Sequence, residues 1–198
     1  MIEFLIRRFV PDWQQVQRTD VRERYGTLAA AVGILSNIFL CIIKGLIGLF
    51  SGSIAVTADA VNNLSDAGSS VITLLAFKIA GKPADEEHPY GHARMEYISG
   101  MAVSFIIILL GLELMGSSFE KILHPEEVGV SALTYLVLIV SIAVKLWQGM
   151  FNRNLGKRIS SEALQATAAD SLNDVFSTGA VLKISCFSSG GSAILAAM

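Results

Sequence analysis

The chain has 198 residues, of which 53% are hydrophobic and only 16% charged, and its formal net charge is −2. This composition is too apolar for an ordinary soluble domain and is typical of a multi-span membrane protein. No basic stripe with interleaved aromatic residues is present, so we expect no nucleic-acid partner. Cys41 and Cys186 lie in apolar stretches without CxxC spacing, which supports neither a disulfide framework nor a thiolate metal site.

The first 25 residues are polar, contain several arginines and lack a small-residue cleavage site. They predict a cytoplasmic N-terminal segment (1–25) rather than a signal peptide. Apolar stretches long enough to cross a bilayer, for which a helix needs about 20 residues, then follow along the chain. They lie near residues 27–50, 54–78, 97–118, 131–150 and 163–187. The fold class predicted is an all-α integral membrane protein, a bundle of about five transmembrane helices.

The connections between these spans predict the orientation in the membrane. Arginines and lysines lie in the segment before the first span, in the connection between spans two and three (Lys82 and Arg94) and in the connection between spans four and five. The connection between spans three and four is acidic and includes Glu126 and Glu127. Because short basic segments stay in the cytoplasm, we expect a multi-pass protein of the cell membrane with a cytoplasmic N-terminus. Spans one and two are joined only by residues 51–53, as in a tight helical hairpin.

Polar residues interrupt two of the predicted spans. Asn62 and Asp66 lie in the second span, and Asp170 and Asp174 lie in the fifth. Each pair is four residues apart, so both side chains lie on one helical face, and Asp59 extends the first face as a pathway candidate. Ionisable groups at membrane depth cost about 2.5–3.5 kcal/mol each and usually line an ion path. The alternative is that they serve only as interhelical hydrogen-bonding groups.

Three carboxylates and one amide supply oxygen donors only. A zinc site would normally include a histidine nitrogen or a cysteine sulfur, so this donor set favours Mn²⁺ over Fe²⁺, Co²⁺ or Mg²⁺. Carboxylates must lose their protons to bind a metal, and metal and protons therefore compete for the same oxygens. That competition is a physical route to metal/proton exchange. A transported ion needs no resident cofactor, and we expect none.

The polar connection between spans two and three holds Asp85, His88 and His92. These side chains could bind a second metal ion. A short structural loop stabilised by Pro89 and Gly91 explains the same residues equally well.

Three further charged residues, Lys44, Glu113 and Lys145, lie within predicted spans. Lys44 and Glu113 fall close to the outer end and Lys145 closer to the cytoplasmic end. Long charged side chains bury their apolar stems and keep their charged heads in water. We therefore expect these residues to reach the membrane interface.

Beyond Leu182 the chain becomes rich in serine and glycine, a poor continuation of a helix. An odd number of spans would also leave the C-terminus outside the cell. We therefore expect a truncated or frameshifted product, in which residues 26–187 form an incomplete transmembrane cation-efflux domain and 188–198 an atypical tail.

Three segments resemble the cation diffusion facilitator (CDF) transporters: GSIAVTADAVNNLSD at 52–66, HPYGHARME at 88–96 and DSLND at 170–174. The resemblance covers residues from about 26 to 182. It implies a homodimeric metal/proton antiporter that exports divalent cations from the cytoplasm. It also implies six spans per protomer and usually a cytoplasmic C-terminal domain, of which the sixth span and that domain are not recognisable here.

The resemblance also implies a transport site. The family's paired positions on its second and fifth spans carry over to Asn62, Asp66, Asp170 and Asp174. This all-oxygen set is similar to that of bacterial manganese exporters, whereas zinc-type members usually have histidine at one or more of these positions. Asp85, His88 and His92 match positions that bind a second zinc ion in some members.

The favoured function is therefore Mn²⁺ efflux by metal/proton antiport. One alternative is efflux of Zn²⁺, Fe²⁺ or Co²⁺, and another is a truncated fragment that does not transport. An intramembrane enzyme that holds Mg²⁺ and a diphosphate would need basic phosphate-binding residues beside its acids. No arginine accompanies these acid pairs, so we expect no enzyme.

Overall fold

The computed structural model of the chain describes residues 2–51, 54–86, 88–123 and 132–196. The described residues form helices and their connections, which confirms the all-α prediction. The helices are α1 (Ile2–Phe9), α2 (Thr19–Ser51), α3 (Ile54–Ala80), α4 (Met95–Leu123), α5 (Ala132–Ile159) and α6 (Glu162–Ala196). The expected tight connection at Gly52 and Ser53 and the acidic Glu126 and Glu127 lie outside the described residues.

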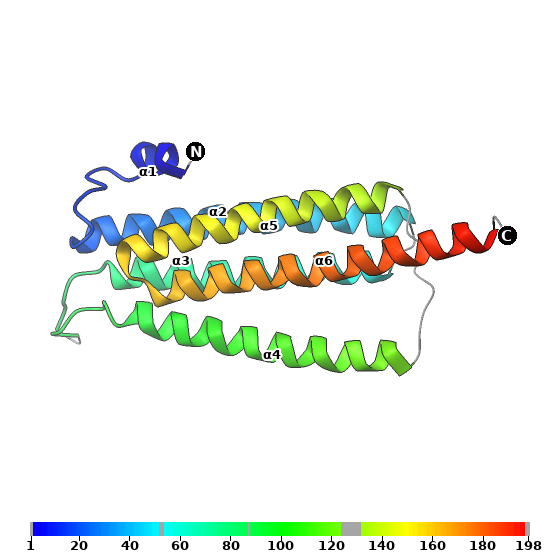
Figure 1. Ribbon diagram of the computed structural model, residues 1–198. Helices are drawn as coiled ribbons and strands as arrows, with labels where there is room; N and C mark the ends of the chain where they lie inside the picture. Colours follow the sequence, from blue (N-terminus) through cyan, green and yellow to red (C-terminus); the bar gives the residue numbers. More distant parts are fainter. Residues whose placement is uncertain (1, 52–53, 87, 124–131, 197–198) are drawn as a thin grey trace.

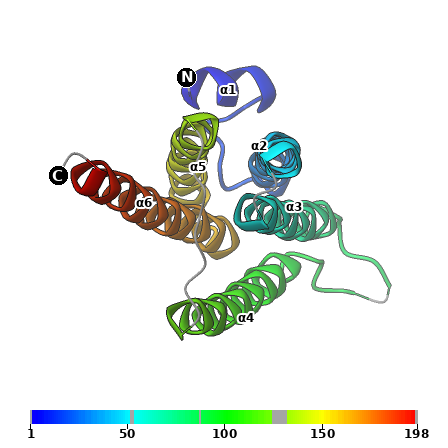
Figure 2. The same ribbon diagram turned by 90° about the vertical axis from the view of Figure 1, so that its right-hand side faces the viewer.

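The five long helices α2–α6 run side by side as an elongated bundle (Figure 1). Helix α2 packs along α3, and α5 packs along α6. Contacts between α2 and α5 join these two pairs, while α4 packs against α3 and α6. Viewed along the bundle, α3 lies between α2 and α4, and α1 lies outside the bundle beside α5 and α2 (Figure 2). This arrangement brings α3 and α6, the helices that carry the acidic pairs, into contact.

Among the described residues, three segments are long and apolar enough to cross a membrane: Thr19–Phe50, Met95–Glu113 and Tyr135–Ile159. The other two long helices, α3 and α6, carry the acidic pairs. Large apolar side chains such as Leu49, Met101 and Phe105 are exposed along the bundle. Such extensive exposed apolar surface fits contact with lipid rather than with water. The structure is that of a helical integral membrane protein.

The C-terminal end of helix α6 lies further along the chain than the sequence predicted. The helix runs to Ala196, past residue 187, and the backbone stays helical through the Ser/Gly-rich segment. The expectation that serine and glycine would end the helix is therefore wrong for this segment. Apolar surroundings offer no water to an unwound backbone, so glycine and serine are tolerated in membrane helices far better than in soluble ones.

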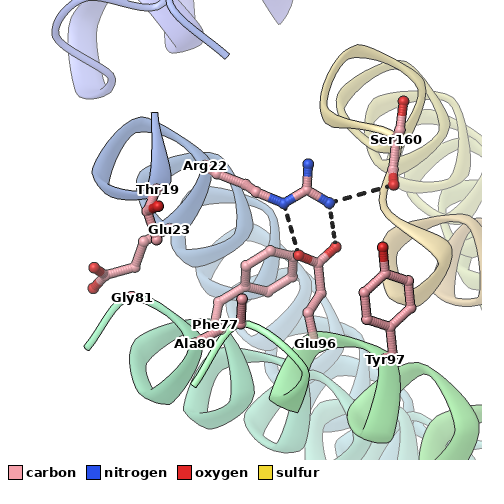
Figure 3. A pocket seen from close by; sticks show the side chains of 10 residues that line it. Thr19, Arg22, Glu23, Phe77, Ala80, Gly81, Glu96, Tyr97 and Ser160 are labelled. Atoms are coloured by element: carbon pink, nitrogen blue, oxygen red, sulfur yellow. Dashed lines mark hydrogen bonds and ion pairs between the residues drawn. The ribbon is translucent and has the colours of Figure 1, made fainter. Parts of the chain in front are cut away.

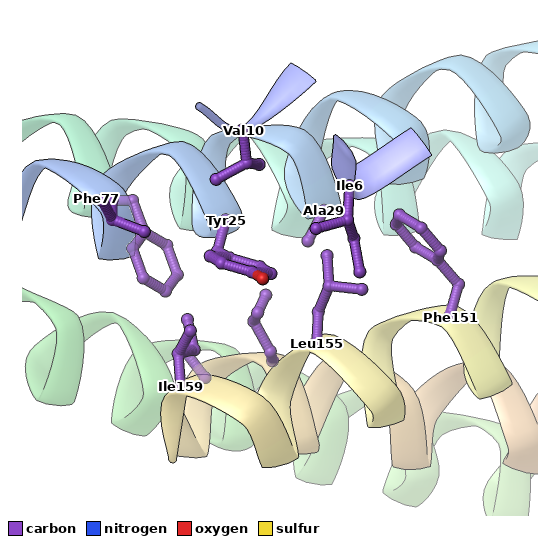
Figure 4. Close-up of a cluster of buried hydrophobic side chains, with 11 residues drawn as sticks. Ile6, Val10, Tyr25, Ala29, Phe77, Phe151, Leu155 and Ile159 are labelled. Carbon is purple, nitrogen blue, oxygen red and sulfur yellow. The ribbon is translucent and has the colours of Figure 1, made fainter. Parts of the chain in front are cut away.

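A cluster of buried hydrophobic side chains closes one end of the bundle (Figure 4). Tyr25, Phe77 and Phe151 join α2, α3 and α5 there, and Ile6 of α1 is buried among them. Gly26 lies against the ring of Phe77 so closely that a Cβ atom at this position would overlap it. Glycine at this position thus allows α2 and α3 to approach each other. The burial of Ile6 in the same cluster packs the N-terminal helix α1 onto the bundle.

Candidate metal centre

Carboxylates from two helices converge inside the bundle. Asp66 of α3 and Asp170 and Asp174 of α6 each place a carboxylate oxygen within 4.8 Å of the others. Asp66 is buried, with 4% of its surface exposed, and Asp170 and Asp174 are half-buried. The structure thus brings together acids that are about a hundred residues apart in the sequence. The one-turn spacing in α6 puts both of its acids on the face that meets α3.

Asn62 and Asp59 continue the same side of α3 with different surroundings. Asn62 lies one turn before Asp66 and is half-buried, so its amide oxygen can join the three carboxylates on that face. Asp59 is engaged elsewhere, because its Oδ2 lies 2.9 Å from the ammonium of Lys44. The carboxylate cluster therefore consists of Asp66, Asp170 and Asp174, with Asn62 beside it, and does not include Asp59.

Lys145 of α5 lies at this cluster, where the sequence did not lead us to expect it. Its Nζ is 2.5 Å from Asp66 Oδ2 and 2.6 Å from Asp174 Oδ2. The residue is only 3% exposed, so the prediction that it reaches the membrane interface is wrong. A buried ammonium is stable when carboxylates pair with it, and moving it to the interface would leave two carboxylates without that partner.

A polar stripe along α5 is the sequence signal for Lys145. Ser141, Lys145, Gln148 and Asn152 are spaced by four, three and four residues, which puts them on one helical face. All four are buried in the structure. Gln148 Oε1 accepts a hydrogen bond of 2.9 Å from Ser36 on α2. Polar residues at helical spacing in a membrane span face the bundle interior, and this rule would have placed Lys145 there.

The prediction that Lys44 reaches the membrane interface is also wrong. Lys44 is 2% exposed and pairs with Asp59 across the contact between α2 and α3. The expectation that its ammonium reaches the interface is therefore wrong, since the ammonium is buried and pairs with a carboxylate on the neighbouring helix. Glu113, by contrast, is exposed on α4.

The loop between α3 and α4 forms a second cluster of metal-ligand types. Asp85, His88 and His92 each offer a ligand atom within 4.8 Å of the others. Asp85 lies 3.1 Å from His88 Nδ1 and 3.6 Å from His92 Nε2. The His88 backbone N–H donates to Asp85 at 2.6 Å and holds the pKa of that carboxyl below its usual range. The carboxylate therefore stays ionised near neutral pH, as a cation ligand requires.

The same loop also has the features of a structural turn. Gly91 adopts a positive φ of 74°, a conformation that glycine reaches without strain. Its N–H donates to the carbonyl of His88 at 2.9 Å. Both interpretations of Asp85, His88 and His92 thus find support in the geometry. The neighbouring Glu87 lies outside the described residues.

A pocket at the end of the bundle contains an arginine–glutamate pair (Figure 3). Arg22 of α2 donates to both carboxylate oxygens of Glu96 on α4, at 2.8 Å each. The same guanidinium donates to the carbonyls of Ile159 and Ser160 at the turn between α5 and α6. Arg22 thus connects α2, α4 and the turn between α5 and α6. Because the charges of Arg22 and Glu96 are already paired, this pocket is not a candidate cation site.

A bundle of long apolar helices with a carboxylate cluster buried between two of them defines the class of membrane ion transporters. Residues 30–190 match the cation efflux transmembrane domain. The chain therefore belongs to the cation efflux family, also known as the cation diffusion facilitators. This is a family of transporters, which removes the intramembrane enzyme from consideration.

Curated relatives are about one-third identical to this chain over the stretch in which they align. The manganese efflux system protein MneS of Bacillus subtilis is 36% identical over 78% of the chain and 55% of its own length. The uncharacterized transporter YdbO of the same organism is 33% identical over 85% of the chain and 58% of its own length. The magnetosome protein MamB of Magnetospirillum gryphiswaldense is 31% identical over 74% of the chain and 50% of its own length. The chain thus spans about half the length of the curated relatives it matches.

Proposed function

We propose that this protein exports a divalent cation, Mn²⁺ by preference, from the cytoplasm in exchange for protons. The observation that carries the proposal is the convergence of Asp66, Asp170 and Asp174 inside the bundle, with Asn62 beside them. Three carboxylates and an amide form the oxygen-only environment that hard divalent cations select. The name of the relative MneS, a manganese efflux protein, agrees with this choice.

Proton exchange follows from the chemistry of the same oxygens. Carboxylates bind a metal only when deprotonated, so each cation that enters the cluster competes with protons for it. A site that alternates between the two sides of the membrane can then couple outward movement of metal to inward movement of protons. The distribution of lysine and arginine favours a cytoplasmic N-terminus in the cell membrane, because the N-terminal segment and the two connections that carry these residues fall on one side. The family resemblance further favours a homodimer.

The loop residues Asp85, His88 and His92 supply two nitrogens and one carboxylate. This mixed donor set suits Zn²⁺ better than Mn²⁺. We propose that they hold a second cation on the cytoplasmic side, distinct from the transported one. Their exposure in the loop would allow exchange with the cytoplasm.

Uptake into everted membrane vesicles tests the proposed function. We expect saturable Mn²⁺ uptake that depends on an acidic vesicle interior and stops when a protonophore removes the pH gradient. The control is Asp170→Asn with Asp174→Asn, which keeps the shape of both side chains and removes two charges from the cluster. Uptake by the double variant at the level of the unchanged protein, with equal amounts in the membrane, would contradict the proposal.

Asn62→His tests the choice of metal. Imidazole nitrogen suits zinc better than an amide oxygen does, so the variant is expected to shift the ratio of Zn²⁺ to Mn²⁺ uptake toward Zn²⁺, by about 10-fold. The ratio is measured with both ions competing in the same vesicles. An unchanged ratio would show that Asn62 does not select the metal.

A further inference from the structure

Lys145 is the one feature of the cation cluster that the transport proposal leaves unused. Its ammonium lies between Asp66 Oδ2 and Asp174 Oδ2, at 2.5 and 2.6 Å. It comes from α5, whereas the carboxylates come from α3 and α6. A third helix thus contributes a positive charge to a cluster of negative ones.

The position of this ammonium coincides with the space that a bound cation needs. Divalent cations lie 2.0–2.6 Å from their carboxylate oxygens, depending on the ion. A cation bound to both Asp66 and Asp174 would therefore occupy the place of Lys145 Nζ. Two positive charges at such short distance repel each other strongly, and the interior screens them little. The metal and the ammonium are mutually exclusive between these two oxygens.

We propose that Lys145 is a built-in competitor of the transported cation, which fills the site when it is empty, leaves when the cation binds and returns as it departs. The inference rests on the proposed function, since it assigns a role at the same site. A returning ammonium would favour release of the cation and prevent the carboxylates from repelling one another. Lys145 is then a residue that sets affinity, without contact to the metal.

A hydrogen-bond acceptor for the displaced ammonium lies nearby on α5. A lysine side chain has a flexible four-carbon stem, and on a helix it leans toward the preceding turn. Ser141 lies one turn before Lys145 on the same buried face, and its hydroxyl has no hydrogen-bond partner among the described residues. The polar stripe of α5 therefore offers an acceptor within the reach of a moving lysine.

Competition by a tethered ammonium also implies selectivity for ion charge. A monovalent cation brings the cluster no more charge than the ammonium it replaces, so the exchange gains little. A divalent cation neutralises one more of the three carboxylates of Asp66, Asp170 and Asp174. Lys145 would therefore exclude Na⁺ and K⁺ while admitting Mn²⁺.

The test is an Mn²⁺ titration of the purified chain in lipid nanodiscs, followed by electron paramagnetic resonance. Lys145→Met is expected to bind Mn²⁺ on the order of 10-fold more tightly than the unchanged protein. Lys145→Gln, a polar neutral replacement, should tighten binding likewise, and Lys145→Arg should keep the original affinity. The matched control is Lys44→Met, because Lys44 is equally buried and also paired with an aspartate, but outside the cluster. Its Mn²⁺ affinity should not change.

The outcomes separate this inference from the proposed function. Unchanged or weaker Mn²⁺ binding in both Lys145→Met and Lys145→Gln, with thermal unfolding like that of the unchanged protein, would overturn the competitor role. A purely structural lysine would give that result, since its loss can only loosen the site. Absence of saturable Mn²⁺ binding in the unchanged protein and in every variant would overturn the proposed function, and the inference with it.

Discussion

Asp66→Asn is expected to lower Mn²⁺ uptake into everted vesicles on the order of 100-fold or more. Asp66 is the most buried of the three clustered carboxylates and the contribution of α3 to them. Asparagine keeps the shape of the side chain but removes the charge that attracts a divalent cation. In a poorly solvated bundle that charge cannot be replaced by water, which is why the expected loss is large.

The control for this experiment is Glu113→Gln. Glu113 is also an acid within a predicted span, but it is exposed on α4 and outside the cluster. We expect Glu113→Gln to transport like the unchanged protein and Asp66→Asn to reach the membrane in equal amount. Full transport by Asp66→Asn would mean that the cation does not pass through the carboxylate cluster.

Arg22→Met is expected to destabilise the protein by about 1–3 kcal/mol, because it leaves a buried carboxylate without the half-buried guanidinium that pairs with it. Glu96 is only 5% exposed and would lose the guanidinium that pairs with both of its carboxylate oxygens. The carbonyls of Ile159 and Ser160 would also lose a donor. The connection between α2, α4 and the turn before α6 would open, as thermal unfolding in detergent would show.

Arg18→Met provides the matched comparison. Arg18 also forms two hydrogen bonds to one carboxylate, that of Asp20, but both side chains are about half exposed. Exposed pairs contribute about 0–1 kcal/mol, so we expect little change in the unfolding temperature. Equal effects of the two substitutions would show that burial of Glu96 does not determine the importance of Arg22.

Spacing in the sequence predicted which acids share a helical face, and the family resemblance paired the two helices that carry them. The four-residue intervals of Asn62 with Asp66 and of Asp170 with Asp174 put each pair on one helical face, and a charged face in a membrane helix turns inward. The structure brings Asp66 and both acids of α6 together as expected. The order and type of the long helices followed from apolar runs of membrane-spanning length.

The lysines could not be placed by the same argument. Distance from the end of a span says how easily a side chain reaches water, but it says nothing about which neighbour the helix presents to it. Lys44 and Lys145 are buried because α3 and α6 place carboxylates opposite them. That placement depends on the rotation of each helix relative to its neighbours, which cannot be inferred from the sequence of one helix alone. The polar stripe through Ser141 and Gln148 was the available signal for Lys145. It becomes visible when the residues of α5 are grouped by helical face rather than by their distance from the end of the span.

The Ser/Gly-rich segment shows a different limit of sequence reasoning. Propensities measured in water make serine and glycine poor helix residues. Helix α6 nevertheless continues to Ala196. In apolar surroundings the backbone has no better partner than itself, so the cost of leaving the helix exceeds the local preference of these residues. Residues 197–198 lie outside the described part of the chain.

The most direct test of the carboxylate cluster as the cation site is an Mn²⁺ titration of the purified chain, read by electron paramagnetic resonance. It should be done with His88→Ala and His92→Ala in place, so that the loop cluster contributes no binding. We predict saturable binding of Mn²⁺ that disappears when Asp66→Asn is added to this background. Equal binding with and without Asp66 would contradict the account, because the ion would then be held somewhere other than between α3 and α6.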